Sequence, residues 1–119
     1  MDAKMTAEQR QALAAYVAAV RARYGANLVD ILVFGSRARG DERDDSDVDL
    51  AILLLGTDWD GWTERSELID LGYETFIELG LRIQPWPVRM ADWQNPEHHT
   101  NPRLIRNMQR DGKNLRDVA

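Results

Sequence analysis

Two apolar runs separated by a short polar turn constrain the fold of this chain more than any other feature. The first run, residues 28–34, is rich in β-branched and aliphatic side chains and ends at Gly35-Ser36. The second, residues 47–55, is almost continuously apolar after Asp49. Runs of this length and type, bounded by turn residues, are typical of β-strands. A continuous apolar run further indicates a strand that is covered on both faces. The sequence therefore predicts two neighbouring strands of a buried sheet.

The ends of these two runs carry groups that suit phosphate and metal chemistry. Gly35 has no side chain, so phosphate oxygens can approach the backbone N–H groups that follow it. Asp47 and Asp49 stand two residues apart in a predicted strand, so their side chains share one face. Two adjacent carboxylates suit Mg²⁺ that also binds nucleotide phosphates. The alternative is an N-cap serine and incidental aspartates, but unpaired carboxylates inside a strand are costly.

The spacing of these residues resembles the signature of a known superfamily. Gly35-Ser36, ten residues, and then Asp47-Val48-Asp49 is similar to the motif of the DNA polymerase beta-like nucleotidyltransferases. At 119 residues the chain most resembles the minimal nucleotidyltransferase (MNT) antitoxins, which are partners of HEPN-domain toxins in prokaryotes. The resemblance covers nearly the whole chain. It implies an α+β nucleotidyltransferase fold, in which helices pack on a small mixed β-sheet, with ATP as substrate and Mg²⁺ as cofactor.

The resemblance also assigns roles to individual residues. The expected nucleotide-binding residues are Gly35, Ser36, Arg37 and Arg39. The expected catalytic and metal-binding residues are Asp47 and Asp49. Bound Mg²⁺ would orient the incoming hydroxyl and neutralise charge at the α-phosphate as pyrophosphate leaves. The alternative for the two arginines is that they are ordinary solvated side chains that do not contact phosphate.

The chain departs from the superfamily pattern at one position. The superfamily commonly supplies a third carboxylate from a neighbouring strand, and the corresponding segment here, residues 81–86, has Gln84 at its central polar position. Glutamine is a poor replacement for a Mg²⁺ ligand that also serves as a base. Three interpretations stay open: two carboxylates suffice, another carboxylate takes this place, or the protein binds without catalysis. The candidate replacements are Asp30, Glu74, Glu78 and Asp92.

The resemblance and the missing third carboxylate lead to three hypotheses about function. The leading hypothesis is an antitoxin that transfers AMP from ATP to a hydroxyl, expected to be a tyrosine, of a HEPN-type ribonuclease toxin. A chain of 119 residues has little room for its own substrate-binding domain, so a partner is expected to supply the acceptor. The alternatives are an antitoxin that acts by binding and occlusion, and a free-standing nucleotidyltransferase of small molecules. A homodimer and a hetero-oligomer with the toxin both remain open.

Composition bounds these hypotheses. The length predicts a single domain, residues 1–119, and the net charge of −5 argues against direct nucleic-acid binding. The absence of cysteine excludes disulfides and thiolate zinc sites. No apolar run approaches membrane-spanning length, and the N-terminus does not resemble a signal peptide, so a cytoplasmic location without membrane association is expected.

Further elements are predicted from local signals. A capping box at Thr6 opens a first helix that ends near Gly25, and Asn101-Pro102 opens the last helix. The expected elements between them are one helix over 62–79, an edge strand over 81–88 that contains two prolines, and a loop over 90–100. His98-His99 is expected to lie in a surface loop, and most of the four tryptophans are expected to be packed.

Overall fold

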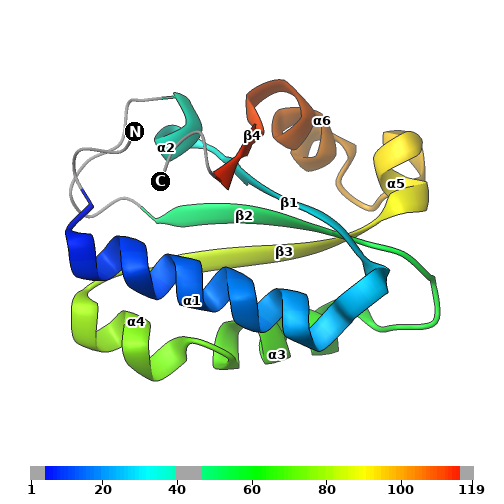
Figure 1. Cartoon of the computed structure of the whole chain (residues 1–119). Coiled ribbons are helices and arrows are strands. Elements are labelled where there is room, and N and C mark those ends of the chain that lie inside the picture. Colours follow the sequence, from blue (N-terminus) through cyan, green and yellow to red (C-terminus); the bar gives the residue numbers. More distant parts are fainter. Residues whose placement is uncertain (1–4, 40–46, 116–119) are drawn as a thin grey trace.

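A four-stranded mixed sheet forms the centre of the computed structural model, which describes residues 5–39 and 47–115 (Figure 1). The strand order is β3-β2-β1-β4. β1 (Leu28–Phe34) pairs antiparallel with β2 (Val48–Leu54), which in turn pairs parallel with β3 (Ile83–Arg89). The two-residue β4 (Lys113–Asn114) closes the other edge, antiparallel to β1. The predicted α+β class with a small mixed sheet is confirmed.

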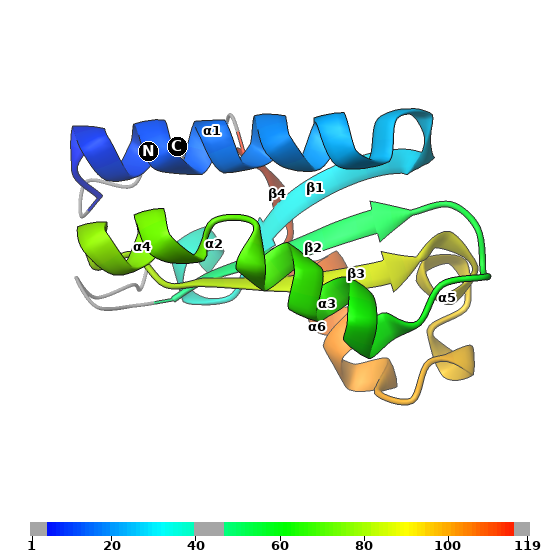
Figure 2. The same cartoon turned by 90° about the horizontal axis from the view of Figure 1, so that it is seen from below.

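Helices cover both faces of the sheet. The long α1 (Ala7–Tyr24) lies on one face with α3 (Gly61–Asp70) and α4 (Tyr73–Leu79), whereas α5 (Met90–Gln94) and α6 (Pro102–Asp111) lie on the other, as Figures 1 and 2 show. The short α2 (Ser36–Arg39) follows β1 directly. None of the helices in the described ranges is long and apolar enough to span a bilayer.

The buried strand β2 divides its side chains between two cores. Alternate residues Leu50 and Ile52 pack in the core beneath α1, while Ala51 and Leu53 pack in the core beneath α6. The side chain of Asp49 belongs to the α6 face by the same alternation. The two-sided covering of this strand confirms the interpretation of its continuous apolar run.

Most predicted boundaries agree with the structure. β1 has the predicted limits, and the first helix has the predicted capping box: Gln9 N donates to Thr6 Oγ1 at 3.0 Å, and Thr6 N donates to Gln9 Oε1 at 2.9 Å. Asn101 caps α6 by accepting a hydrogen bond from Leu104 N at 3.2 Å. β3 lies at a sheet edge, where its prolines are tolerated.

Two predicted elements are wrong. The single helix over 62–79 is broken between α3 and α4 at Gly72, where a Cβ atom would lie 2.4 Å from Phe76 Cε2 and 2.9 Å from Tyr16 Cδ1. The missing side chain makes room for the edge-to-face contact of these two rings, whose centroids are 5.1 Å apart. Residues 90–100 are not a loop throughout, because they contain α5 and a 3₁₀ turn over Pro96–His98. Strand β4 was not predicted.

Candidate functional site

The register between β1 and β2 brings the Gly-Ser turn against the paired carboxylates. Phe34 lies opposite Asp49, so Gly35, the next residue, leaves the sheet beside that carboxylate. Gly35 has a φ of +75°, and a Cβ atom on it would lie 2.6 Å from Asp49 Oδ2. Only glycine permits both this backbone conformation and this approach. The turn predicted from sequence is therefore packed directly on the second predicted motif.

The four predicted nucleotide-binding residues differ in their surroundings. Ser36 opens α2, whose Ala38 N and Arg39 N each donate to Gly35 O at 3.1 Å. Arg37 is buried, with 6% of its surface exposed, and Arg39 Nη1 forms an ion pair with Asp111 Oδ2 at 3.1 Å. Residues 40–46, which complete the acidic turn, lie outside the described residues. The phosphate-binding roles of these residues stay predictions.

Asp47 presents a buried carboxylate oxygen that is paired with an arginine. Arg82 Nε lies 2.8 Å from Asp47 Oδ1 as an ion pair. No donor among the described residues is aligned to form a hydrogen bond with this oxygen. A metal ion bound by Asp47 would therefore share the carboxylate with Arg82.

Asp49 is held in an unfavourable electrostatic environment. Its pKa is raised to about 6, first by burial and second by the negative charge of Asp47, with a partial offset from the positive charge of Arg39. A divalent cation between the two carboxylates would relieve both the repulsion and part of the desolvation cost. The pair therefore has the electrostatic character of a metal-binding site.

The raised pKa predicts that Asp49→Asn stabilises the protein at neutral pH. The pKa of Asp49 rises from 3.8 to about 6 on folding, so between these pH values the folded state binds more protons than the unfolded state. The free energy of unfolding therefore falls as the pH rises through this range. Urea unfolding at pH 7.5 without metal should show a gain of about 1 kcal/mol for Asp49→Asn, after allowance for solvent screening. The gain should vanish at pH 3.5. Equal stabilities at pH 7.5 would contradict the raised pKa.

The position of the missing third carboxylate is held by a hydrogen-bonded pair. Gln84 lies in register with Asp49 on the neighbouring strand β3. Its Oε1 accepts a hydrogen bond from Arg65 Nη2 at 2.8 Å. Arg65 also donates through Nε to Pro85 O at 3.0 Å, and its guanidinium lies over the ring of Trp86, 4.0 Å from the centroid. Arginine only donates, so the amide oxygen of Gln84 faces Arg65 and is engaged there.

None of the four candidate carboxylates completes the pair. Among residues 5–39 and 47–115, no group of three His, Cys, Asp or Glu side chains is arranged to hold a metal ion. Asp30 lies opposite Leu53, far along β1 from the Gly-Ser turn, and Asp92 lies in α5 beyond the end of β3. Glu74 and Glu78 belong to α4, on the other face of the sheet. Arg65 and Arg82 could not be predicted from local patterns, because their partners are distant along the chain.

The comparison with protein families decides the assignment. The family described as "Polymerase beta, Nucleotidyltransferase" matches residues 21–117, which include every element from the end of α1 to β4. The chain belongs to this family. No curated protein is a significant match to this nucleotidyltransferase. The matched range contains both the Gly-Ser turn and the paired carboxylates.

Two solved structures share the fold of this nucleotidyltransferase. One, a toxin–antitoxin crystallised with AMP-PNP, has a TM-score of 0.55 and 18% identity, with 87% of this chain and 76% of that chain covered. Another, described as a nucleotidyltransferase from Sulfolobus solfataricus, has a TM-score of 0.51 and 22% identity, with 71% of this chain and 70% of that chain covered. At these identities the likeness shows the fold alone.

The residues of this nucleotidyltransferase fit a divalent cation. The carboxylates of Asp47 and Asp49, which repel each other, are hard anionic groups on one face, and substrate phosphates would supply further oxygens. When bound, Mg²⁺ neutralises phosphate charge and aligns the reacting oxygens. Gln84 would not join these ligands while its oxygen is bonded to Arg65. The described residues therefore provide two carboxylate ligands.

Proposed function

We propose that this nucleotidyltransferase is an antitoxin that transfers AMP from ATP, with Mg²⁺, to a tyrosine hydroxyl of a HEPN-type ribonuclease toxin and so neutralises it. The observation that carries the proposal is the packing of Gly35 on Asp49, which shares a strand face with Asp47, in a chain of this family. The toxin partner is supported by the MNT-like motif and by the similar fold of a toxin–antitoxin crystallised with AMP-PNP. The same motif and the same structural likeness support ATP as the donor of the AMP group.

In the proposed reaction, the residues of the chain bind the donor and orient it. The open backbone at Gly35-Ser36 would receive the β- and γ-phosphates, and Asp47 and Asp49 would hold the metal, which would neutralise phosphate charge. The acceptor oxygen then attacks the α-phosphorus and loses its proton to solvent. The bond from the α-phosphorus to the bridging oxygen breaks, and pyrophosphate leaves in line with the attack. Binding and alignment supply most of the rate enhancement in such reactions.

A cell-growth experiment tests the proposal. The product of the neighbouring gene, as the proposed toxin, is expressed alone, with wild-type protein, and with Asp47→Asn/Asp49→Asn protein. Wild type should restore growth, and the variant, which lacks the metal-binding carboxylates, should not. Equal rescue by both proteins would show that catalysis is not the means of neutralisation.

A second function is favoured by one observation. Gln84 occupies the third-carboxylate position and is bonded to Arg65, so residues 5–39 and 47–115 offer no third carboxylate to act as base. The alternative is therefore an antitoxin that neutralises its toxin by binding and occlusion. This alternative predicts a stable complex without ATP and rescue of growth by the double variant.

A further inference from the structure

The sheet order indicates the side from which an acceptor reaches the proposed site. In-line displacement places the attacking oxygen and the leaving pyrophosphate on opposite sides of the α-phosphorus. With the β- and γ-phosphates over the turn that follows β1 and the α-phosphate beside β2, the leaving group lies toward β1. β3 flanks β2 on the opposite side. An acceptor for this site must therefore approach over β3, past Gln84.

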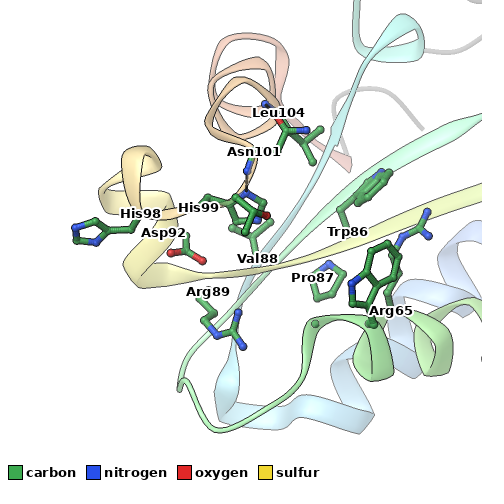
Figure 3. Close-up of a pocket in the computed structure, with 13 residues that line it drawn as sticks. Arg65, Trp86, Pro87, Val88, Arg89, Asp92, His98, His99, Asn101 and Leu104 are labelled. Atoms are coloured by element: carbon green, nitrogen blue, oxygen red, sulfur yellow. Dashed lines mark hydrogen bonds between the residues drawn. The ribbon is translucent and has the colours of Figure 1, made fainter.

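A cavity opens on this side of the molecule (Figure 3). It has a volume of about 530 Å³, within the range of small-molecule sites. Its floor is formed by Trp86, Pro87 and Val88 of β3, with Leu104 of α6 opposite. Trp86 is two residues after Gln84 on the same face of β3, so the cavity begins roughly 7 Å along the strand from the level of Asp49.

Aromatic surface at the mouth of the cavity suits a planar ring. Trp62, which also lines the cavity, is 76% exposed at the start of α3. A tryptophan this exposed is unusual and gains free energy when another apolar or aromatic group covers it. Trp86 supplies a second indole, which is only half-buried. The guanidinium of Arg65 covers one face of Trp86, so a ring that packs on Trp62 would share the cavity with Arg65.

Arg65 binds the residue at the position of the missing carboxylate. Of its five N–H donors, two bind Gln84 and Pro85, so three make no hydrogen bond to the described residues. No carboxylate in the described ranges forms an ion pair with it. Its charge is thus available to an anion that enters the cavity.

We propose that this cavity receives the acceptor of the nucleotidyl transfer, and that Arg65 stabilises the ionised acceptor oxygen in place of the carboxylate base. The inference rests on the proposed function. A guanidinium does not accept a proton, so it can favour attack only by lowering the pKa of the hydroxyl, whose proton passes to water. The arrangement therefore selects an acidic hydroxyl on an aromatic ring. An aliphatic hydroxyl would remain protonated beside Arg65.

The test uses 4-nitrophenol as the probe, because its ionisation is followed by visible absorbance without nucleotide or partner. When bound to wild-type protein, the probe should titrate about one pH unit below its free value, since a nearby opposite charge lowers the pKa. Arg65→Gln should restore the free value. Gln84→Glu should also restore most of it, because the new carboxylate would neutralise Arg65. Trp62→Ala should weaken probe binding at least threefold. The pKa of the probe that still binds should be shifted as in wild type.

The charge-matched control is Arg21→Gln, which removes an exposed arginine of α1 on the other face of the sheet and should preserve the shift. Unfolding midpoints show whether each variant is folded. If Arg65→Gln does not fold, Gln84→Glu still tests the effect of the Arg65 charge on the probe. Absence of probe binding to wild type, an unshifted bound probe, or a shift that survives both substitutions would overturn the proposal. ATP binding plays no part in the assay, so its outcome is independent of the proposed transfer.

Discussion

Asp47→Asn/Asp49→Asn protein should bind ATP in the presence of Mg²⁺ at least roughly 100-fold more weakly than wild type. These two side chains provide all the carboxylate ligands that the described residues offer to a metal at this site. Amide oxygens are neutral and leave the metal without charge compensation. Calorimetric titration of ATP into protein at pH 7.5, with Mg²⁺ and with EDTA, measures the metal-dependent part of the affinity. A pH above 7 is chosen because the pKa of Asp49 is raised to about 6.

The control for lost negative charge is Asp70→Asn/Glu74→Gln, which removes two carboxylates from α3 and α4 on the other face of the sheet. This variant should bind ATP as wild type does. Undiminished metal-dependent binding by Asp47→Asn/Asp49→Asn protein would show that the carboxylate pair does not hold the metal.

Gly35→Ala should lower the free energy of unfolding by about 2–3 kcal/mol, with a matched substitution, Gly80→Ala, costing only about 1 kcal/mol. Both glycines have positive φ angles, +75° and +66°, so both alanines carry the left-handed backbone penalty. Only the alanine at Gly35 would place Cβ against another atom, 2.6 Å from Asp49 Oδ2, whereas nothing lies within 4 Å at Gly80. Urea unfolding of both variants measures the difference. Equal costs would contradict the close approach of the turn to Asp49.

Sequence patterns predicted the parts of the fold that local physics controls. The limits of β1, the Thr6 capping box and the Asn101 cap depend on residues within a few positions of one another. The shared face of Asp47 and Asp49 follows from strand alternation alone. Local signals of this kind were sufficient to predict the carboxylate pair and the glycine turn beside it.

Features that depend on distant contacts were not predictable in this way. The break at Gly72 reflects the packing of Phe76 against Tyr16, a residue of a different helix. The bonds of Arg65 to Gln84 and of Arg82 to Asp47 each join residues that only the tertiary fold brings together. The short helix α5 lies in a segment rich in loop-forming residues, where no helical period was visible.

The two arginines change how the incomplete carboxylate set is understood. Arg82 forms an ion pair with Asp47, and Arg65 engages the oxygen of Gln84, so cations flank the pair where a third anion would be expected. These cationic side chains would favour anionic phosphates near the pair. A glutamine at position 84 is therefore compatible with nucleotide binding. Catalysis would then depend on another way to activate the acceptor hydroxyl.

The most direct test of the proposed transfer is the intact mass of the protein encoded by the neighbouring gene, the proposed toxin, after incubation with this protein, ATP and Mg²⁺. We expect a mass increase of one AMP or a small whole number of AMP units, located on a tyrosine and absent when Asp47→Asn/Asp49→Asn protein is used. An unchanged toxin mass in a stable, neutralised complex would contradict transfer and would establish occlusion instead.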